Sequence, residues 1–265
     1  MPTNDQTIDR IRSHLSTLRL TRMDKELDKQ LAAAVKEKLP PSVFLERILA
    51  LEANDLLQRR IERRIVESKL PQRKLLADFD FDFQTGVDKA QIMELSTLSF
   101  VGRNQGLILA GSSGTGKSHI AKALLLIGCQ KCFRCRYTTA AAMLSDLLAG
   151  LADETLERKL KNYLSPQLLL IDELGFDRLE QESARNASLF FKVIDGRYCK
   201  TSTIITSNID FKDLGDYLGD PVVTTAIVDR MVHHSVIISI DGPSYRMHES
   251  TKINTRKTNP ASKKS

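Results

Sequence analysis

A glycine-rich run with one lysine, GSSGTGKS, stands between an apolar stretch and a segment with helical spacing. Gly111, Gly114 and Gly116 permit backbone angles that a β-carbon forbids, so the loop can present free N–H groups to an anion. Lys117 can reach the β- and γ-phosphates of a nucleotide, and the Ser118 hydroxyl can bind Mg²⁺. The spacing therefore predicts a site for a nucleoside triphosphate. The predicted phosphate-binding residues are Gly111, Ser112, Ser113, Gly114, Thr115, Gly116, Lys117 and Ser118.

Two adjacent carboxylates end a second apolar run, LLLIDELG. Asp172 can hold Mg²⁺ together with Ser118, and Glu173 can orient or deprotonate a water that attacks the γ-phosphate. A third run, STIITSN, ends at Asn208, whose amide could hold that water. An Asn that ends a strand in a turn is the commoner reading of that residue alone. Together these motifs predict binding of ATP and Mg²⁺ and hydrolysis to ADP and phosphate.

These side chains need a parallel sheet to bring them together. The run GLILAG before the glycine-rich loop predicts a buried strand, and HIAKALLLIG after it predicts a helix. Asp172 lies far enough beyond Lys117 for a helix, a strand and further helices to intervene. The sequence therefore predicts an α/β domain in which helices flank a parallel sheet.

The chain ahead of these motifs is organised differently. Apolar residues recur at helical spacing from Ile8, a second helix begins near a capping-box-like pair, Thr21 and Asp24, and a long amphipathic helix ends near Ser68. We therefore predict three regions. They are an all-α N-terminal domain at 1–68, an ATPase domain at 69–249 and a basic disordered tail at 250–265.

Composition limits the kind of protein. The chain has 265 residues, 42% of them hydrophobic and 27% charged, which suffices for one large core and a small second domain. It has no secretory leader pattern and no apolar run of membrane length, so we expect a cytoplasmic protein without membrane contact. The net charge is +6, and the tail is rich in Lys and Arg without any acid. Contact with a nucleic-acid backbone and a purely solubilising role are both open readings of this tail.

Basic residues on the long N-terminal helix are candidates for DNA contact. They are Arg59, Arg60, Arg63 and Arg64. Pairs four residues apart on a helix could follow a track of phosphates. Glu62 and Glu67 stand among them, so a solvated charged face is an equal reading.

Cys129, Cys132 and Cys135 have a spacing that resembles part of an iron–sulfur site. They run from the end of a helix into a strand, and no Cys-Pro follows, so we predict reduced structural thiols. The adjacent His233 and His234 do not predict a metal site either, because neighbouring side chains on a helix or strand point apart.

Residues 78–246 resemble the ATP-binding transposition helper proteins of the IstB type, which are AAA+ P-loop ATPases related to the helicase loader DnaC. The resemblance rests on GSSGTGKSH, LLLIDELGF, STIITSN, GDPVVTTAIVDRMVHH and GPSYR, in this order, and on N-terminal helices followed by RRIERRI. It implies an AAA+ fold behind a small helical domain. It also implies a homo-oligomer that assembles on double-stranded target DNA under ATP control and assists an IstA-like partner transposase.

The resemblance further implies roles for single residues. It assigns the sensor-1 residue, the arginine finger and the sensor-2 residue to Asn208, Arg230 and Arg246, respectively. Arg230 has a plainer reading as an ion-pair partner of Asp229 or Asp220, and Arg197 is a second candidate for the finger.

Two further sets of residues have less specific expectations. Phe79 and Phe81 either line an adenine pocket or pack between domains. Helicase loaders and initiators carry an extra helix that faces DNA at the position of LERKLKNY, which makes Arg158, Lys159 and Lys161 candidate DNA contacts.

Three classes of function remain open. The first is an ATPase that regulates DNA transactions, as a transposition helper or as a replicative helicase loader of the DnaC type. The second is a P-loop kinase, although Glu173 directly after Asp172 suits activation of water better than an acceptor pocket. The third is a nucleotide-gated DNA-binding module that hardly turns over.

Overall fold

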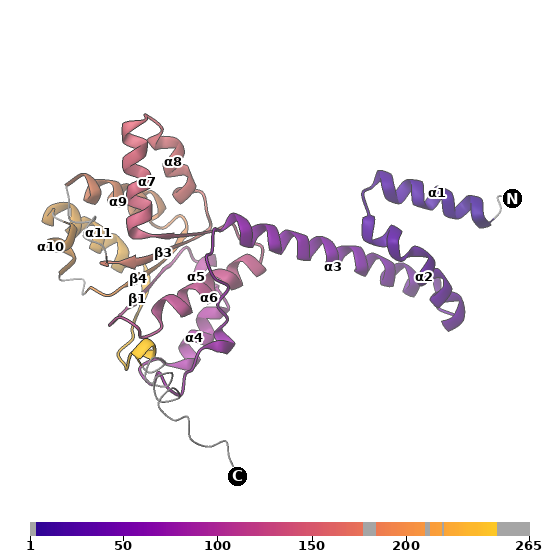
Figure 1. Ribbon diagram of the computed structural model, residues 1–265, viewed down its shortest axis with the longest axis horizontal. Coiled ribbons are helices and arrows are strands. Elements are labelled where there is room, and N and C mark those ends of the chain that lie inside the picture. Colours follow the sequence, from indigo (N-terminus) through magenta and orange to yellow (C-terminus); the bar gives the residue numbers. More distant parts are fainter. Residues whose placement is uncertain (1–3, 177–183, 210–212, 219, 248–265) are drawn as a thin grey trace, which may run out of the picture. The chain divides into compact units, whose positions relative to one another are not determined.

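The computed structural model describes residues 4–176, 184–209, 213–218 and 220–247, so the predicted tail lies outside the described residues (Figure 1). The chain divides into two units, Met1–Arg63 and Arg64–Ser265. The division falls inside one helix, whose last turn, from Arg64, belongs to the second unit. There the Arg64 carbonyl accepts from the Cys129 thiol, and the Ser68 carbonyl accepts from the Tyr137 N–H at 2.7 Å.

The N-terminal unit is built from amphipathic helices, as the spacing predicts. It contains α1 (Asn4–Thr17), α2 (Thr21–Glu37) and most of α3 (Pro41–Glu67). Their apolar faces share a small core. Its buried residues are Leu15, Met23, Leu27 and Ile48, with Ile8, Leu20, Leu31 and Phe44 packed against them.

The start of α2 corrects one expectation. Thr21 does not cap α2, because the capping position is occupied by Leu20, whose side chain makes no capping hydrogen bond. The buried carboxylate of Glu52 on α3 instead accepts from the N–H groups of Arg22 and Met23, at 2.8 and 2.9 Å. A negative charge at a helix N-terminus is favourable, so this contact joins α3 to α2.

The second unit contains a five-stranded parallel sheet. In chain order the strands are β1 (Gly106–Ala110), β2 (Cys135–Thr139), β3 (Leu168–Leu174), β4 (Ser202–Ser207) and β5 (Ser235–Ser239). Their order in the sheet is β2-β3-β4-β1-β5. All strands run in the same direction, so the segments that follow β1, β3 and β4 lie together at the carboxyl ends of the strands.

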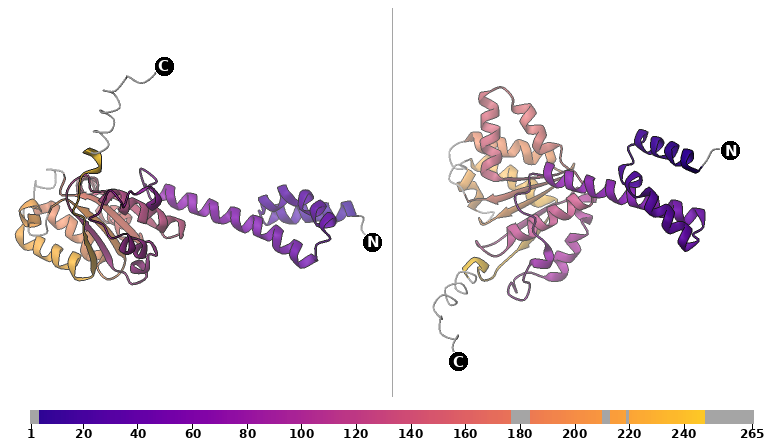
Figure 2. Two further views of the ribbon diagram at one scale, coloured as in Figure 1. Left: turned by 90° about the horizontal axis from the view of Figure 1, so that it is seen from below. Right: turned by 45° about the vertical axis from the view of Figure 1, so that its right-hand side comes forward.

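Helices cover both faces of this sheet (Figures 1 and 2). One face carries α6 (Lys117–Gln130), beside which lie α4 (Lys89–Ser96) and the short α5 (Ser99–Gly102). The opposite face is covered by the other helices of the unit. These are α7 (Ala140–Ala152), α8 (Leu156–Leu164), α9 (Ala184–Arg197), α10 (Leu214–Leu218) and α11 (Pro221–His233). A 3-10 turn, Leu76–Asp78, precedes α4.

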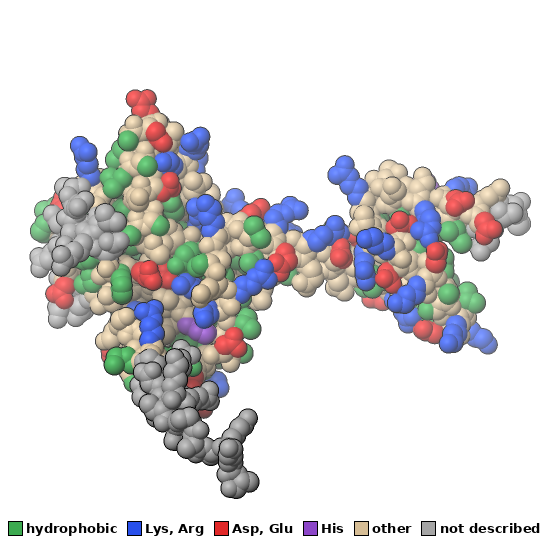
Figure 3. Space-filling view, viewed as in Figure 1, with side chains coloured by type: hydrophobic (Ala, Val, Ile, Leu, Met, Phe, Trp, Pro, Cys, Tyr) green, Lys and Arg blue, Asp and Glu red, His purple; other side chains and the backbone are tan. Residues whose placement is uncertain are grey.

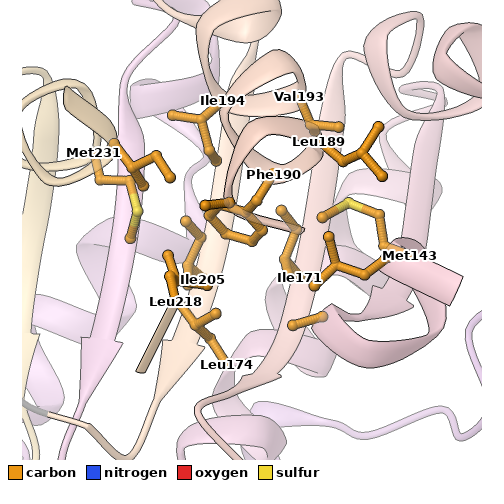
Figure 4. Close-up of a cluster of buried hydrophobic side chains, with 14 of the residues drawn as sticks. Met143, Ile171, Leu174, Leu189, Phe190, Val193, Ile194, Ile205, Leu218 and Met231 are labelled. Carbon is orange, nitrogen blue, oxygen red and sulfur yellow. The ribbon is translucent and has the colours of Figure 1, made fainter. Parts of the chain in front are cut away.

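The larger core lies beneath α7, α9 and α11. Phe190 on α9 is fully buried and packs among Ile171 of β3, Ile205 of β4 and Met231 of α11 (Figure 4). β3 is buried on both faces, which explains its unbroken apolar run at Leu168–Ile171. β4 is also largely buried, although only Ile204 and Ile205 in it are apolar. This packing holds the strand ends that carry the polar motifs.

The cysteines are structural residues of this unit. Cys129 on α6 and Cys135 on β2 are buried free thiols, while Cys132 lies half-buried in the turn between them. In the described parts of the chain, no three His, Cys, Asp or Glu side chains form a group that could hold a metal ion. No helix among the described residues is both long and apolar enough to cross a membrane.

Candidate nucleotide-binding site

The glycine-rich loop connects β1 to α6 and requires glycine for two reasons. Gly114 and Gly116 have φ angles of 83° and 96°, in the left-handed region that residues with a side chain rarely adopt. A β-carbon on Gly114 would also lie 2.1 Å from the Ser244 hydroxyl oxygen, and one on Gly116 would lie 2.5 Å from the Phe79 ring. Only glycine therefore fits at these two positions, and the loop carries no side chain there that could cover its N–H groups, as suits a phosphate cradle.

Lys117 is the first residue of α6, and its side chain folds over this loop. Its Nζ donates to the carbonyl oxygens of Gly111 and Ser112, each at 2.6 Å. Burial lowers the pKa of Lys117, and the nearby positive charge of Arg246 lowers it further. A cation held in this way, among open backbone amides, suits a polyphosphate ligand.

Asp172 on β3 is fully buried and saturated with partners. Its Oδ1 accepts from the hydroxyls of Ser118 and Thr206 at 2.7 and 2.6 Å. Its Oδ2 accepts from the Tyr137 hydroxyl at 3.3 Å and pairs with Lys122 Nζ at 3.0 Å. Burial acts to raise the pKa of Asp172, but the Thr206 hydrogen bond and the Lys122 charge together hold it below its usual value. The ionised carboxylate beside a serine hydroxyl is an oxygen donor set that fits Mg²⁺.

Glu173 has the opposite environment because β3 bulges at this point. Between the pairs Ile171–Ile205 and Leu174–Ser207, β3 has one residue more than β4. Glu173 adopts a φ of 63°, and its side chain is exposed and lines the cleft. A non-glycine residue in this conformation is strained, and such strain occurs often at functional sites.

Thr206 on β4 connects the two carboxylates. Its hydroxyl oxygen accepts from the Glu173 N–H at 2.9 Å and donates to Asp172 at 2.6 Å. One side chain thereby fixes both the buried carboxylate and the backbone of the bulge. Sequence reasoning missed Thr206, Tyr137 and Lys122, although Lys122 lies one helical turn after Ser118 and could have been found on that spacing.

A cleft of about 330 Å³ brings these residues together. Its lining includes Lys117, Ser118, Glu173, Asn208 and Arg246, which come from four separate segments. Asn208 and Arg246 are both exposed in it. Most of the predicted residues thus line one cavity, namely those from Ser113 to Ser118 together with Glu173, Asn208 and Arg246. Asp172 lies buried behind the Ser118 hydroxyl, and Gly111 and Ser112 are not part of the lining.

The two phenylalanines ahead of α4 divide in position. Phe79 lines the cleft against Gly116 and the ring of His119, whose centroid is 5.5 Å away. Phe81 is absent from the described cleft lining and supports Phe79 edge-on, with ring centroids 4.7 Å apart. Both pack within the second unit, so neither supports the alternative of packing between domains.

Arg230 lies on the last turn of α11, which leads into the start of β5. Arg230 therefore lies near the amino ends of the strands, whereas the phosphate loop of the same chain lies at their carboxyl ends. Its Nε pairs with Asp195 at 2.7 Å, and its guanidinium lies 4.8 Å from the centroid of the Phe191 ring. The sequence predicts Asp229 or Asp220 as its ion-pair partner, but neither has this role among the described residues. Asp220 instead caps the start of α11, and Asp195 is the residue that pairs with Arg230.

Arg197 cannot be the alternative finger. Its side chain is 1% exposed and donates to the carbonyl groups of Tyr163, Pro166 and Ser202 and to the Thr203 hydroxyl. These acceptors come from the end of α8, the loop after it and β4. Arg197 is a buried structural residue that ties these segments together, and the expectation that it could serve as a finger is wrong.

The candidate DNA contacts on α3 have different surroundings. Arg59 pairs with Asp55 at 2.7 Å and Glu52 at 3.3 Å, and Arg64 pairs with Glu67 at 2.9 Å. Arg60 and Arg63 are exposed and form no ion pair among the described residues. Figure 3 shows basic and acidic side chains interleaved along this helix.

The candidates on α8 also divide. Lys159 lies between Asp146 and Asp153, at 3.6 and 3.5 Å, and only 17% of its side chain is exposed. Arg158 and Lys161 are exposed and form no ion pair within the described part of the chain. The two adjacent histidines separate as expected, because His233 contacts the Tyr198 hydroxyl and His234 contacts the Arg103 carbonyl.

The strand order and the phosphate loop define an AAA+ P-loop fold. Two solved structures share it. DnaI has a TM-score of 0.54 at 23% identity, covering 64% of this chain and 92% of that one. AMPPCP-bound DnaA from Aquifex aeolicus has a TM-score of 0.52 at 19% identity, covering 72% and 57%.

The chain belongs to the family of IstB-like ATP-binding proteins, whose family model matches residues 13–253. One relative is named as an ATP-binding protein of insertion sequence IS21 from Pseudomonas aeruginosa. It is 37% identical over 250 residues, covering 94% of this chain and 93% of that protein. Another, named for insertion sequence IS5376 of Geobacillus stearothermophilus, is 35% identical over 241 residues, covering 91% and 95%. The predicted family and fold class are confirmed.

Proposed function

We propose that this protein is a Mg²⁺-dependent ATPase that binds DNA as a homo-oligomer and assists an IstA-like transposase. The relatives that match more than nine-tenths of this chain are named for insertion sequences, which favours a transposition helper over a helicase loader of the DnaC type. The similarity to DnaI is a similarity of fold alone and does not favour a role in helicase loading. A cytoplasmic location is part of the proposal.

ATP would bind through the loop residues Gly111 to Ser118, with Lys117 facing the β- and γ-phosphates. Ser118 and Asp172 would hold Mg²⁺, which supplies positive charge to the phosphate oxygens when it is bound. Asp172 stays ionised for this task because Thr206 and Lys122 stabilise its charge.

The observation that carries the proposal is the contrast between two adjacent carboxylates. Asp172 is buried and fully bonded, whereas the bulge turns Glu173 into the cleft. Glu173 can therefore orient or deprotonate water, with Asn208 beside it as a second polar group. This arrangement suits hydrolysis better than transfer to a small acceptor.

The position of Arg230 supports action between subunits. Its own cleft lies at the other end of the strands, so Arg230 can assist hydrolysis only in a neighbouring copy. Asp195 and Phe191 hold the guanidinium in place before such a contact forms. An arginine that enters a neighbouring site stabilises the charge on the departing phosphoryl group.

DNA binding would use basic residues that are not already paired. These are Arg60 and Arg63 on α3 and Arg158 and Lys161 on α8. Arg59, Arg64 and Lys159 are weaker candidates than the sequence predicts, because DNA would have to displace their carboxylate partners.

Release of free phosphate from ATP, measured with and without duplex DNA, tests this proposal. We expect turnover that requires Mg²⁺ and rises when DNA is added. Turnover that is negligible under both conditions would indicate a passive nucleotide-gated module. Transfer of the γ-phosphate to a metabolite would indicate a kinase.

A further inference from the structure

Three segments that are distant in sequence meet at the buried side chain of Gln84, which is 2% exposed. Its Nε2 donates to the carbonyl of Thr115, in the phosphate loop, at 2.9 Å. The same Nε2 donates to the carbonyl of Pro243, after β5, at 3.3 Å. Pro243 stands three residues before Arg246, so one amide group contacts both the loop and the segment that carries this arginine.

The surrounding contacts make this junction tight. The Tyr245 N–H donates to the Gly114 carbonyl at 3.0 Å, and the Tyr245 ring packs edge-on against Phe83, with centroids 5.5 Å apart. Gln84 follows Phe83 directly, so two adjacent residues hold the segment at 243–246. The backbone that carries Arg246 is therefore fixed against the loop from two sides.

Such a clamp has a physical purpose, because Arg246 and Lys117 carry like charges in one cleft. Burial lowers the pKa of Lys117, and the repulsion from Arg246 lowers it further. The same repulsion would drive a mobile arginine away from the loop. Hydrogen bonds from a neutral amide to two carbonyls oppose this movement without adding charge.

We propose that Gln84 is a positioning residue that couples the phosphate loop to Arg246 and so lets the cleft distinguish ATP from ADP. The inference rests on the proposed ATPase function and on the sensor-2 role that the family resemblance implies for Arg246, which we take to sense the γ-phosphate. Gln84 itself acts through the backbone at Thr115 and Pro243.

Gly242 offers an independent way to disturb Gln84. A β-carbon on Gly242 would lie 1.7 Å from Gln84 Oε1 and 2.8 Å from its Cδ. The backbone of Gly242 is not in the left-handed region, so alanine can adopt its conformation. Gly242→Ala should therefore displace the Gln84 amide without changing any group of Gln84. Gly102→Ala is the matched control, because no atom lies within 4 Å of a β-carbon placed there.

The test uses the full-length protein and measures dissociation constants for AMPPCP and ADP in Gln84→Leu, Gly242→Ala, Arg246→Ala and Gly102→Ala. Loss of a hydrogen bond to a charged group should make Arg246→Ala lose roughly tenfold in preference for AMPPCP over ADP. Gln84→Leu and Gly242→Ala should lose most of the same preference. Their ADP affinity should stay close to that of Gly102→Ala. Gln84→Leu should melt at a lower temperature, because it leaves the Thr115 and Pro243 carbonyls without this donor, so binding is measured well below the melting temperature of every variant.

A double variant, Gln84→Leu with Arg246→Ala, separates coupling from independent effects. We expect its preference to equal that of Arg246→Ala alone. A further loss in the double variant, or an unchanged preference in both Gln84→Leu and Gly242→Ala, would overturn the role of Gln84 while leaving that of Arg246. An unchanged preference in Arg246→Ala would instead overturn the sensing role itself, and the inference with it.

Discussion

At the scale of single residues, adjacent acids acquire separate tasks from their surroundings. Asp172 receives four hydrogen-bonding or charged partners and is sealed from solvent. Glu173 faces the cleft because its backbone adopts a left-handed conformation. A metal-binding role therefore suits the first carboxylate and a water-activating role suits the second.

We expect Glu173→Gln to bind ATP normally and to hydrolyse it about 10²- to 10⁴-fold more slowly, because the amide keeps the shape but cannot accept a proton. Single-turnover phosphate release and equilibrium binding of a fluorescent ATP analogue measure the two properties. Lys117→Ala is the contrasting variant and should lose binding itself. Normal hydrolysis by Glu173→Gln would remove this residue from the mechanism.

Thr206→Val should both destabilise the protein and slow hydrolysis. The change keeps the side-chain shape at a position that is 1% exposed, but it removes a donor to Asp172 and an acceptor for the Glu173 N–H. Leaving such buried groups unpaired costs about 1–3 kcal/mol. Urea unfolding measures this loss, with Thr225→Val on the exposed face of α11 as control. Equal stability of the two variants would argue against the bridging role of Thr206.

The nucleotide cleft could largely be predicted from sequence because its chemistry lies in short contiguous motifs. Residue type and the apolar strands before them indicate the roles of Lys117 and Asp172. Thr206 and Gln84 could not be identified in this way, since their importance comes from contacts with distant segments. A threonine inside an apolar strand and a glutamine in a loop carry no spacing pattern of their own.

At the scale of elements, Arg197 on α9 is bonded to α8 and β4, which the sequence does not predict. Its position at the end of a helix made it resemble an exposed arginine finger. The buried guanidinium of Arg197 donates to carbonyl groups of Tyr163, Pro166 and Ser202. Two of these residues are distant from Arg197 in sequence, so its burial cannot be predicted from local spacing. Likewise, the cap of α2 comes from Glu52 on another helix, which a local search for capping residues cannot find.

We expect Arg197→Met to lower the free energy of unfolding by about 2–4 kcal/mol, because it leaves several buried carbonyls without donors. Arg230→Ala, by contrast, should leave stability nearly unchanged and reduce turnover. Chemical denaturation and steady-state phosphate release on both variants test the contrast. A stable Arg197→Met variant without ATPase activity would restore Arg197 as a catalytic residue.

At the scale of the whole molecule, the nucleotide cleft and Arg230 lie at opposite ends of the strands of one sheet. The cleft follows β1, β3 and β4, whereas Arg230 precedes β5. If Arg230 acts as proposed, a single copy carries an incomplete site at each end of the strands. Assembly of like copies would complete both, and basic residues outside the cleft would remain free for DNA.

DNA binding should depend on the unpaired arginines of α3. Each phosphate contact contributes about −0.9 to the slope of log K against log salt concentration, so Arg60→Gln with Arg63→Gln should flatten the slope by roughly 2. Arg59→Gln is the matched control, because Arg59 is already paired with Asp55 and Glu52. Binding to duplex DNA at several salt concentrations measures the slopes. Equal slopes for the double variant and the unaltered protein would move the DNA surface away from α3.

Mixing two inactive variants tests whether ATP hydrolysis is shared between subunits. Lys117→Ala lacks a working loop but keeps Arg230, and Arg230→Ala keeps the loop but lacks the finger. Steady-state phosphate release is measured for each variant alone and for a one-to-one mixture, after light scattering has established that subunits exchange. We predict that the mixture recovers activity, because an intact loop can then meet an intact Arg230. A mixture that exchanges subunits and stays as inactive as its components would show that Arg230 does not serve a neighbouring subunit.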